Sequence, residues 1–251
     1  MYFKTRPPFI STMRLQTLIA LPCILLAFMA CDKSKDELPG TQPGFIPKLS
    51  KIAYYEGASL IRITTIQYDT QGRLIKMELT NWRDETYHYG QDIIIREASF
   101  LNSEDTEFID TLQLNNDGLV IFDPRDGSNY EYTSEGYRQR QFASFGDYSS
   151  TISNGNTTLT TNRDWVSQNI ISTNEYTFLP DKLNTIGSEN VGITFYGKQD
   201  KNLLYEDTFT YLYGGRHDQT IHHYSYEFDD KNRVKKKMRS DGIYWLYTYA
   251  N

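Results

Sequence analysis

The chain of 251 residues is long enough for one large β domain or two small domains, and its 39% hydrophobic and 23% charged residues exclude a disordered protein. Its 20 tyrosines, against 3 Trp and 13 Phe, favour strands whose rings cover apolar surface while their hydroxyls stay hydrated. A formal net charge of -6 argues against non-specific binding to nucleic acid, which needs a basic surface, and we expect no nucleic-acid partner.

The N-terminal segment has the composition of an export signal. A positive charge is followed by an almost uninterrupted apolar stretch that ends at Ala30, a small residue directly before Cys31. A membrane-spanning helix needs about 20 apolar residues, and Pro22 interrupts this stretch, so a cleaved signal peptide fits better than a transmembrane anchor. We predict a signal peptide over residues 1–30, with Met13 as an alternative start.

Cysteine usage supports this interpretation. The chain has 2 Cys, and Cys23 lies within the segment expected to be removed, so the mature chain keeps only Cys31, at its first position. A disulfide needs two cysteines, so the domain must be held together by core packing. Lipidation explains an unpaired cysteine in an exported chain. We therefore predict that a lipid on Cys31 binds the protein to a membrane.

Residues 31–47 are predicted to form a flexible tether between the lipid and the domain. Prolines and glycines lie among charged and polar residues there, and such a composition cannot bury enough apolar surface to fold. An ordered edge segment is the alternative, because terminal segments become ordered when a fold ties them down.

Residues 48–251 are predicted to form a single all-β domain. No window of twelve or more residues has helical periodicity, whereas period-two alternation is frequent. Ile75, Met77 and Leu79 share one face of a strand, and residues 223–228 alternate in the same way. Alternation places one face on a core and the other in water. We predict a large antiparallel meander of about 10–14 strands, curled or barrel-like.

Four-residue turn signals separate these strands. Each follows an apolar or aromatic strand end and finishes on Gly or Asn, the residues that tolerate the left-handed backbone needed after a type I turn. The clearest signals are residues 69–72, 115–118, 133–136 and 229–232. Their spacing is irregular and indicates one hairpin in about 20–25 residues.

Two segments depart from this pattern. Residues 149–162, rich in Ser, Thr and Asn, fit either a long loop or a polar hairpin that turns on Asn154 and Gly155. Residues 243–250 are apolar or aromatic on both faces, which predicts a strand at the centre of the sheet or beneath a cover.

Two short motifs resemble known ones. Tyr68-Asp69-Thr70-Gln71-Gly72-Arg73-Leu74 resembles the YD repeat of Rhs-type surface proteins, and residues 228–234 are a looser copy. Phe28-Met29-Ala30-Cys31 resembles a bacterial lipobox, except that Phe28 stands where an aliphatic residue is usual. Acidic residues follow the cysteine, as in Bacteroidetes-type surface lipoproteins.

Taken together with the tyrosine-rich hairpins, these motifs resemble a Bacteroidetes lipoprotein family of unknown function with a porin-like fold. The resemblance implies a meander curled toward a barrel. It also implies a lipid-anchored protein of the outer membrane that faces the periplasm or the cell surface. It supplies no catalytic residues.

A porin-like fold does not require insertion into the bilayer. A transmembrane barrel presents apolar side chains to the lipid, and a charge at bilayer depth costs about 2–4 kcal/mol. Many side chains expected to face outward here are charged: Lys76, Glu78, Arg138, Arg140, Lys235, Lys237 and Arg239. We therefore predict a barrel that is not membrane-spanning.

No group of residues in the sequence predicts catalysis, a metal site or a cofactor. His222 and His223 are adjacent, so on a strand they face opposite sides and cannot easily ligate one ion; His88 and His217 are the remaining histidines. With 32 acidic residues, chance carboxylate pairs are inevitable, so no glycosidase pair can be assigned. The mature chain also lacks a nucleophile motif. We predict that the protein is not an enzyme.

Trp82 and Trp165 are the candidate ligand-binding residues, since exposed rings form platforms for sugars or peptides; cross-strand packing is the alternative. The basic run Lys235–Lys237 fits either an edge strand that discourages association or a patch for an anionic ligand. The sequence thus predicts a lipid-anchored cell-envelope lipoprotein with a binding or structural role. Its partners would be the membrane and a glycan or envelope protein. A glycan-binding module for nutrient capture is the alternative function, and a glycan-active enzyme is a further one.

Overall fold

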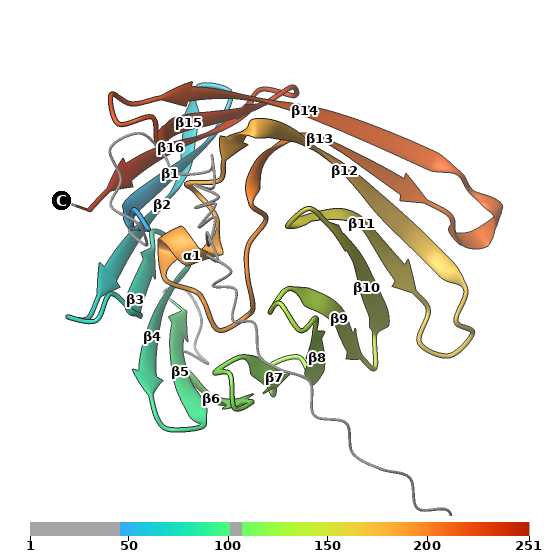
Figure 1. Cartoon of the computed structure of the whole chain (residues 1–251), viewed down its shortest axis with the longest axis horizontal. Helices are drawn as coiled ribbons and strands as arrows, with labels where there is room; N and C mark the ends of the chain where they lie inside the picture. The colour runs from blue at the N-terminus through green and yellow to red at the C-terminus, as the bar shows by residue number, and fades with distance from the viewer. Residues whose placement is uncertain (1–45, 101–106, 251) are drawn as a thin grey trace, which may run out of the picture. The chain divides into compact units, whose positions relative to one another are not determined.

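A computed structural model describes residues 46–100 and 107–250, and within them sixteen strands form one closed antiparallel barrel (Figure 1). Its elements are β1 (Leu49–Glu56), β2 (Ser59–Tyr68), β3 (Leu74–Leu79), β4 (Arg83–Tyr89), β5 (Ile93–Phe100), β6 (Glu107–Leu114), β7 (Val120–Asp123), β8 (Ser128–Tyr132), β9 (Arg138–Ala143), β10 (Gly146–Ser153), β11 (Asn156–Arg163), β12 (Ile170–Leu183), α1 (Ser188–Val191), β13 (Asn202–Tyr211), η1 (Tyr213–Gly215), β14 (Asp218–Phe228), β15 (Val234–Arg239) and β16 (Ile243–Tyr249).

The predicted antiparallel meander, curled into a barrel, is confirmed. It has more strands than the ten to fourteen expected, partly because β7 and β8 are only 4 and 5 residues long and were hard to separate from their turns. The predicted signal peptide, Cys31 and the tether up to residue 45 lie outside the described residues. Within the described ranges, no helix is both long and apolar enough to cross a membrane.

The barrel closes through β1, which pairs with β2 on one side and with β16 on the other. Tyr54 lies between Arg62 of β2 and Trp245 of β16. The apolar segment expected to be central is therefore part of the closure. β15 is likewise paired with both β14 and β16. The interpretation of its basic run as an edge-strand device is wrong, because closure leaves β15 no free edge.

The four turn signals are confirmed, and all four turns lie at one end of the barrel. In each turn the first N–H donates to the carbonyl four residues later, at 2.8–3.0 Å. The left-handed residues are Gly72, Gly118, Gly136 and Asn232, and each turn is flanked by a β-bulge. These turns follow β2, β6, β8 and β14, and connections between antiparallel neighbours alternate between the two ends. We call the shared end the plug end.

Tyrosine hydroxyls form hydrogen bonds to backbone carbonyls at the plug end of the barrel. Each of four tyrosines donates a hydrogen bond to the carbonyl of the first residue of the preceding strand, and each of those first residues has a fully buried side chain. The pairs are Tyr68–Leu49, Tyr89–Leu74, Tyr132–Val120 and Tyr249–Val234, at 2.6–3.0 Å. The ring covers the core while the hydroxyl satisfies a buried carbonyl. Four of the 20 tyrosines thus have a structural role at the plug end.

The connection between β12 and β13, residues 184–201, folds into the barrel and carries α1 (Figure 1). We call it the plug. The Phe195 carbonyl accepts a hydrogen bond from the Val120 N–H at 2.7 Å, and the Asn190 amide donates to the Pro47 carbonyl at 2.9 Å. Gly192, with φ 84°, must be glycine because a Cβ would lie 2.9 Å from the Tyr68 ring.

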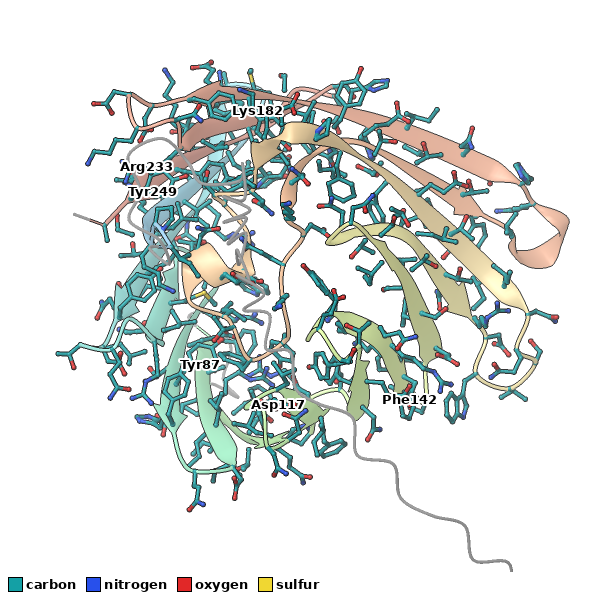
Figure 2. The ribbon with its side chains drawn as sticks, viewed as in Figure 1. Tyr87, Asp117, Phe142, Lys182, Arg233 and Tyr249 are labelled. Carbon is teal, nitrogen blue, oxygen red and sulfur yellow. The ribbon has the colours of Figure 1, made fainter. Side chains whose placement is uncertain are left out.

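The hydrophobic core lies between the plug and the strands of the first half of the chain. Phe195, only 3% exposed, contacts the rings of Tyr87 and Tyr89, with centroids 5.8 and 6.4 Å away. The buried cluster comprises Leu49, Ile66, Leu74, Tyr87, Ile94, Leu112, Val120, Tyr130 and Phe195. A sixteen-stranded barrel is too wide to be filled by its own wall. The plug therefore contributes to this core: its Phe195 packs on Tyr87, which is labelled in Figure 2, and Ile186, Val191 and Ile193 pack against the cluster.

Residues 149–162 form the polar hairpin, and the long-loop alternative is wrong. β10 and β11 meet at Asn154 and Gly155, whose φ angles are 52° and 77°. These left-handed conformations are those of a tight two-residue hairpin turn, which Asn-Gly favours.

The predicted outward orientation holds for some charged residues, such as Lys76 and Glu78, and fails for Arg138, Lys237 and Arg239, the last of which shares the face of Lys237. Lys76 pairs with Glu78 and, at 3.6 Å, with Asp84 on the outer face. Arg138 and Lys237 instead line cavities inside the barrel. The cause is the bulge in each strand, which inserts one extra residue and reverses the alternation on its far side.

Candidate functional site in the barrel lumen

Part of the barrel interior beside the plug is left open. A cavity of about 720 Å³ lies between the plug and the inner faces of β8–β12; we call it the lumenal cavity. Small-molecule sites usually have volumes of roughly 300–1,000 Å³. Its lining includes Tyr130, Tyr137, Arg138, Gln141, Tyr148, Ser150, Thr157, Thr160, Tyr176, Tyr196, Lys198 and Asp200.

Strand register brings the wall of the lumenal cavity together. Gln141 of β9 lies opposite Tyr130 on one side and Tyr148 on the other. One step further, Ser150 of β10 pairs with Thr160 of β11. Directly opposed residues share a face, so phenol, amide and hydroxyl groups form one continuous inner surface. The plug supplies the opposite wall.

A smaller cavity of about 320 Å³ adjoins the first, because Tyr148 and Thr160 line both. Phe209 and Tyr211 of β13 complete its wall. Its lining includes Asn162, whose Oδ1 atom is buried and has no hydrogen-bond partner within the described residues. Buried acceptors are nearly always satisfied by protein or water. This open half of the barrel therefore has hydrogen-bonding capacity that the wall does not use.

Burial raises the pKa of three groups that line the lumenal cavity. It raises the pKa of Tyr176 and, with the negative charge of Asp123, that of Tyr196. Both phenols thus remain hydrogen-bond donors at neutral pH. Burial also raises the pKa of Asp200, although the Thr157 N–H donates to its Oδ1 at 2.6 Å and opposes the shift.

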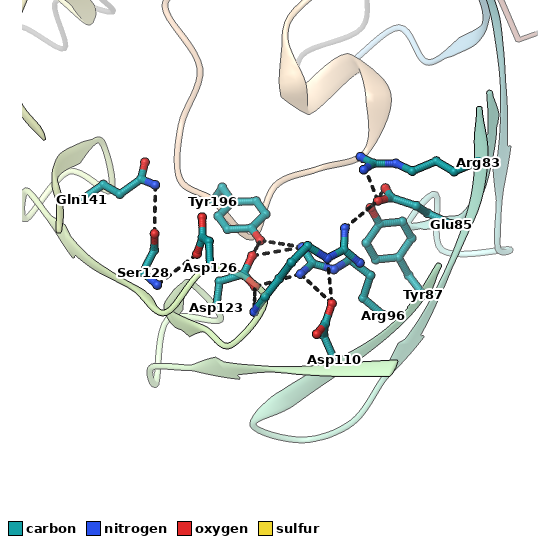
Figure 3. Close-up of polar contacts among 11 residues, drawn as sticks. Arg83, Glu85, Tyr87, Arg96, Asp110, Asp123, Asp126, Ser128, Gln141 and Tyr196 are labelled. Carbon is teal, nitrogen blue, oxygen red and sulfur yellow. Dashed lines mark hydrogen bonds and ion pairs between the residues drawn. The ribbon is translucent and has the colours of Figure 1, made fainter. Parts of the chain in front are cut away.

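A buried charge network ties the plug to the wall (Figure 3). Arg96 donates to both oxygens of Asp123, at 2.8 and 3.0 Å, and to Asp110 at 3.0 Å. Tyr196 of the plug donates to Asp123 at 2.6 Å. Burial opposes ionisation of Asp123, but these donors outweigh it and hold its pKa below 3.8.

The same network extends to a third carboxylate. Glu85, 3% exposed, accepts hydrogen bonds from Arg125 at 3.0 Å and from the Tyr87 hydroxyl at 2.7 Å, and it pairs with Arg83 at 3.0 Å. Arg125 also donates to Asp110 at 2.8 Å. Three carboxylates thus face three guanidinium groups. Each of the three acids accepts a hydrogen bond from at least one of these arginines.

Lys237 lies in a separate interior cavity of about 240 Å³. Its Nζ is 4.2 Å from the ring centroid of Tyr224 and 5.4 Å from that of Trp245. Burial lowers the pKa of Lys237 to about 8, while the charge of Asp207 partly opposes the shift. The Lys237 ammonium thus lies over the faces of two aromatic rings.

The two predicted ligand-binding tryptophans do not belong to the lumenal cavity. Trp82 lies in the turn after β3 and Trp165 in the turn after β11, so both are at the end opposite the plug end. They are 42% and 43% exposed. Arg62 and Arg83 lie over the Trp82 ring, and Trp165 is parallel to Phe142 at 6.3 Å. Contacts with neighbouring side chains therefore cover a large part of the surface of both rings.

The histidines are placed as the strand alternation predicts. His222 faces inward, where its Nδ1 lies 3.2 Å from Asp207, and His223 faces outward, 3.2 Å from Glu206. Across the described ranges, no group of three or more His, Cys, Asp and Glu side chains is placed so that it could hold a metal ion. Cys31, the predicted lipidation site, lies outside those ranges.

The comparisons with known proteins identify the fold. No protein-family model matches the chain, and no curated protein matches its sequence. A porin-like protein from Bacteroides uniformis ATCC 8492 has a similar structure, with a TM-score of 0.53 and 14% identity over 80% of this chain and 98% of that one. A porin-like protein from Bacteroides vulgatus ATCC 8482 aligns with a TM-score of 0.42 at 12% identity, over 81% and 99% of the two chains. The chain thus has a fold similar to that of a porin-like protein.

Proposed function

We propose that this protein is a lipid-anchored cell-envelope protein whose barrel binds a small polar ligand in the lumenal cavity. The observation that carries the binding role is the lumenal cavity itself. Its lining has hydroxyl, amide and phenol groups that converge on an open space of about 720 Å³. A purely structural barrel gains nothing from leaving such groups around an open volume, because close packing stabilises a core.

The anchor is proposed from the sequence around Cys31, and the outer face of the barrel supports a position outside the bilayer. Lys76, Glu78 and Asp84 lie in adjacent strands on the outer face. His88 and Glu97 form a further outer pair at 3.5 Å. Charges on a lipid-facing wall cost about 2–4 kcal/mol each. The lipid, and not the strands, would therefore hold the protein to the membrane.

Replacing the anchor residue is expected to release the protein. Cells that make the Cys31→Ser variant should yield it in the soluble envelope fraction, whereas the wild type pellets with membranes and incorporates labelled fatty acid. Cys23→Ser is the matched control and should remain membrane-bound, because that residue lies in the segment to be removed. A Cys31→Ser variant that still pellets with membranes after a salt wash would contradict the proposed anchor.

Ligand binding can be tested by filling the lumenal cavity. Ser150 lies on its wall, so Ser150→Trp should abolish the thermal stabilisation that any bound member of a panel of sugars, organic acids and amino acids gives the wild type. Ser149→Trp, on the opposite face of the same strand, should retain it. Stabilisation that survives in Ser150→Trp would place the ligand elsewhere, with Trp82 and Trp165 as the next candidates.

The proposal includes no enzymatic activity. The buried carboxylates Glu85, Asp110 and Asp123 are engaged by arginines, whereas general acid–base chemistry needs a group free to exchange a proton with a substrate. Hydrolysis of a polysaccharide by the purified protein would contradict this part of the proposal.

A further inference from the structure

The lumenal cavity contains two cationic side chains with unused charge. Neither Arg138 nor Lys198 forms an ion pair with any carboxylate in the parts of the chain that the structure describes. Each lies instead over an aromatic ring: the Arg138 guanidinium is 5.9 Å from the Tyr130 centroid, and the Lys198 ammonium is 5.6 Å from the Tyr137 centroid. Arg138 is exposed to the lumen, so its fork of donors remains available.

Asp200, the acidic residue in the lining of the same cavity, forms no ion pair with Arg138 or Lys198 in the described part of the chain. Asp200 is held by the backbone N–H and hydroxyl of Thr157, and burial raises its pKa. The neighbouring Arg140 is different from Arg138, because Asp147 binds it through two hydrogen bonds at 2.7 and 2.9 Å. Arg138 and Lys198 thus bring two positive charges without an ion-pair partner into the lining of the lumenal cavity, in a protein whose net charge is -6. A negatively charged group is the complement that Arg138 and Lys198 lack.

The rest of the lining is suited to a hydroxylated ligand. Gln141, Ser150 and Thr160 offer both donors and acceptors, and the phenols of Tyr148 and Tyr176 add ring faces beside them. Aliphatic side chains are few in this wall. Aromatic faces combined with amide and hydroxyl groups match the alternating apolar and hydroxyl-bearing faces of a sugar ring better than they match an aliphatic acid.

We propose that the lumenal cavity binds a short acidic oligosaccharide, with a sugar carboxylate at Arg138 and Lys198 and the ring hydroxyls on the amide and hydroxyl wall. The inference rests on the proposed binding function and specifies the ligand class for the same site. The guanidinium of Arg138 can bind a carboxylate through two parallel hydrogen bonds, whereas Lys198 contributes a single charge.

Isothermal titration calorimetry of the full chain in detergent tests this proposal with three probes. The acidic probe is trigalacturonate, the neutral probe is maltotriose, and citrate is an anion without sugar rings. We expect trigalacturonate to bind at least tenfold more tightly than either of the others. Arg138→Gln should weaken its binding at least tenfold, and Arg138→Lys should weaken it less. Lys198→Gln gives a second, independent variant at an exposed position.

Arg163→Gln is the matched control, because Arg163 lies outside the cavity and donates to the Gln168 carbonyl in the turn after β11. Its affinity for trigalacturonate should equal that of the wild type. Maltotriose could instead bind as tightly as trigalacturonate, and Ser150→Trp could abolish that binding. This result would overturn the proposal of an acidic ligand but would still support binding in the lumenal cavity. If citrate bound as tightly as trigalacturonate, the proposal that the ligand is a saccharide would be overturned. Absence of trigalacturonate binding, or its persistence unchanged in both Arg138→Gln and Lys198→Gln, would overturn the proposal as a whole.

Discussion

Asp123→Ala is expected to lower the free energy of unfolding by about 3 kcal/mol at pH 7, because it leaves the buried Arg96 with only part of its counter-charge. Arg96 is held by two hydrogen bonds to Asp123 and one to Asp110. The variant also removes the acceptor of the Tyr196 hydroxyl and so loosens the plug. Urea unfolding followed by tyrosine fluorescence measures the change.

Glu78→Gln serves as the control for this variant. Glu78 is 40% exposed and pairs with Lys76 on the outer face, and such surface pairs contribute at most about 1 kcal/mol. Equal losses for Asp123→Ala and Glu78→Gln would contradict the structural role of the charge network.

The effect of Asp123 should also depend on pH. Its folded-state pKa lies below the ordinary value of 3.8, so its contribution is fully present above the unfolded-state pKa of about 3.9 and is lost as the pH falls through the folded-state pKa. The difference in stability between wild type and Asp123→Ala should therefore be constant from pH 5 to pH 7 and should shrink in acid below about pH 4. A difference that grows on acidification would have the wrong sign.

Phe195→Ala is expected to destabilise the protein by about 3–5 kcal/mol, the usual cost of deleting a buried aromatic ring. Phe195 is a plug residue, 3% exposed, whose ring contacts that of Tyr87 on β4 and that of Tyr196, its neighbour in the plug. Because Phe195 belongs to the buried core cluster of the barrel, the loss should lower the denaturation midpoint of the whole barrel and not only that of a loop.

Phe145→Ala is the matched control for the plug variant. Phe145 is 54% exposed in the turn between β9 and β10, so its removal should change the unfolding free energy by less than about 0.5 kcal/mol. A Phe195→Ala variant as stable as Phe145→Ala would mean that the plug does not form part of the core.

Local features of this fold could be predicted because they depend on neighbouring residues. A turn such as Asp69 to Gly72 needs an acceptor side chain at its first position and a left-handed residue at its last, and both are visible in the sequence. The same holds for the hairpin at Asn154 and Gly155. The opposite faces of His222 and His223 follow from the strand period alone.

The orientation of Lys237 could not be predicted, because it depends on a bulge. Counting every second residue from Val234 places Lys237 outside, but the extra residue at the bulge reverses the face. Arg138 was misplaced for the same reason. A register shift is a property of two paired strands, and a single sequence does not show how its strands pair.

The lumenal cavity was missed because its residues meet only after closure of the barrel. Tyr130, Ser150 and Asp200 lie on different strands or on the plug and are far apart in the chain. The plug itself left a partial signal, since residues 184–201 contain apolar residues without strand alternation and three glycines. Such a segment between two long strands indicates a connection whose apolar residues pack against the domain. The sequence does not show which strands it contacts.

The central claim is that the plug lies inside the barrel as part of its core, and amide hydrogen exchange tests it most directly. The N–H of Val120, bonded to the Phe195 carbonyl, and the N–H of Ile193, bonded to the Ser188 carbonyl, should exchange as slowly as those of the barrel strands, at the rate of global unfolding. Exchange of both amides at the fast rate of the turn residues 165–167 would show that the plug is a surface loop and contradict the account.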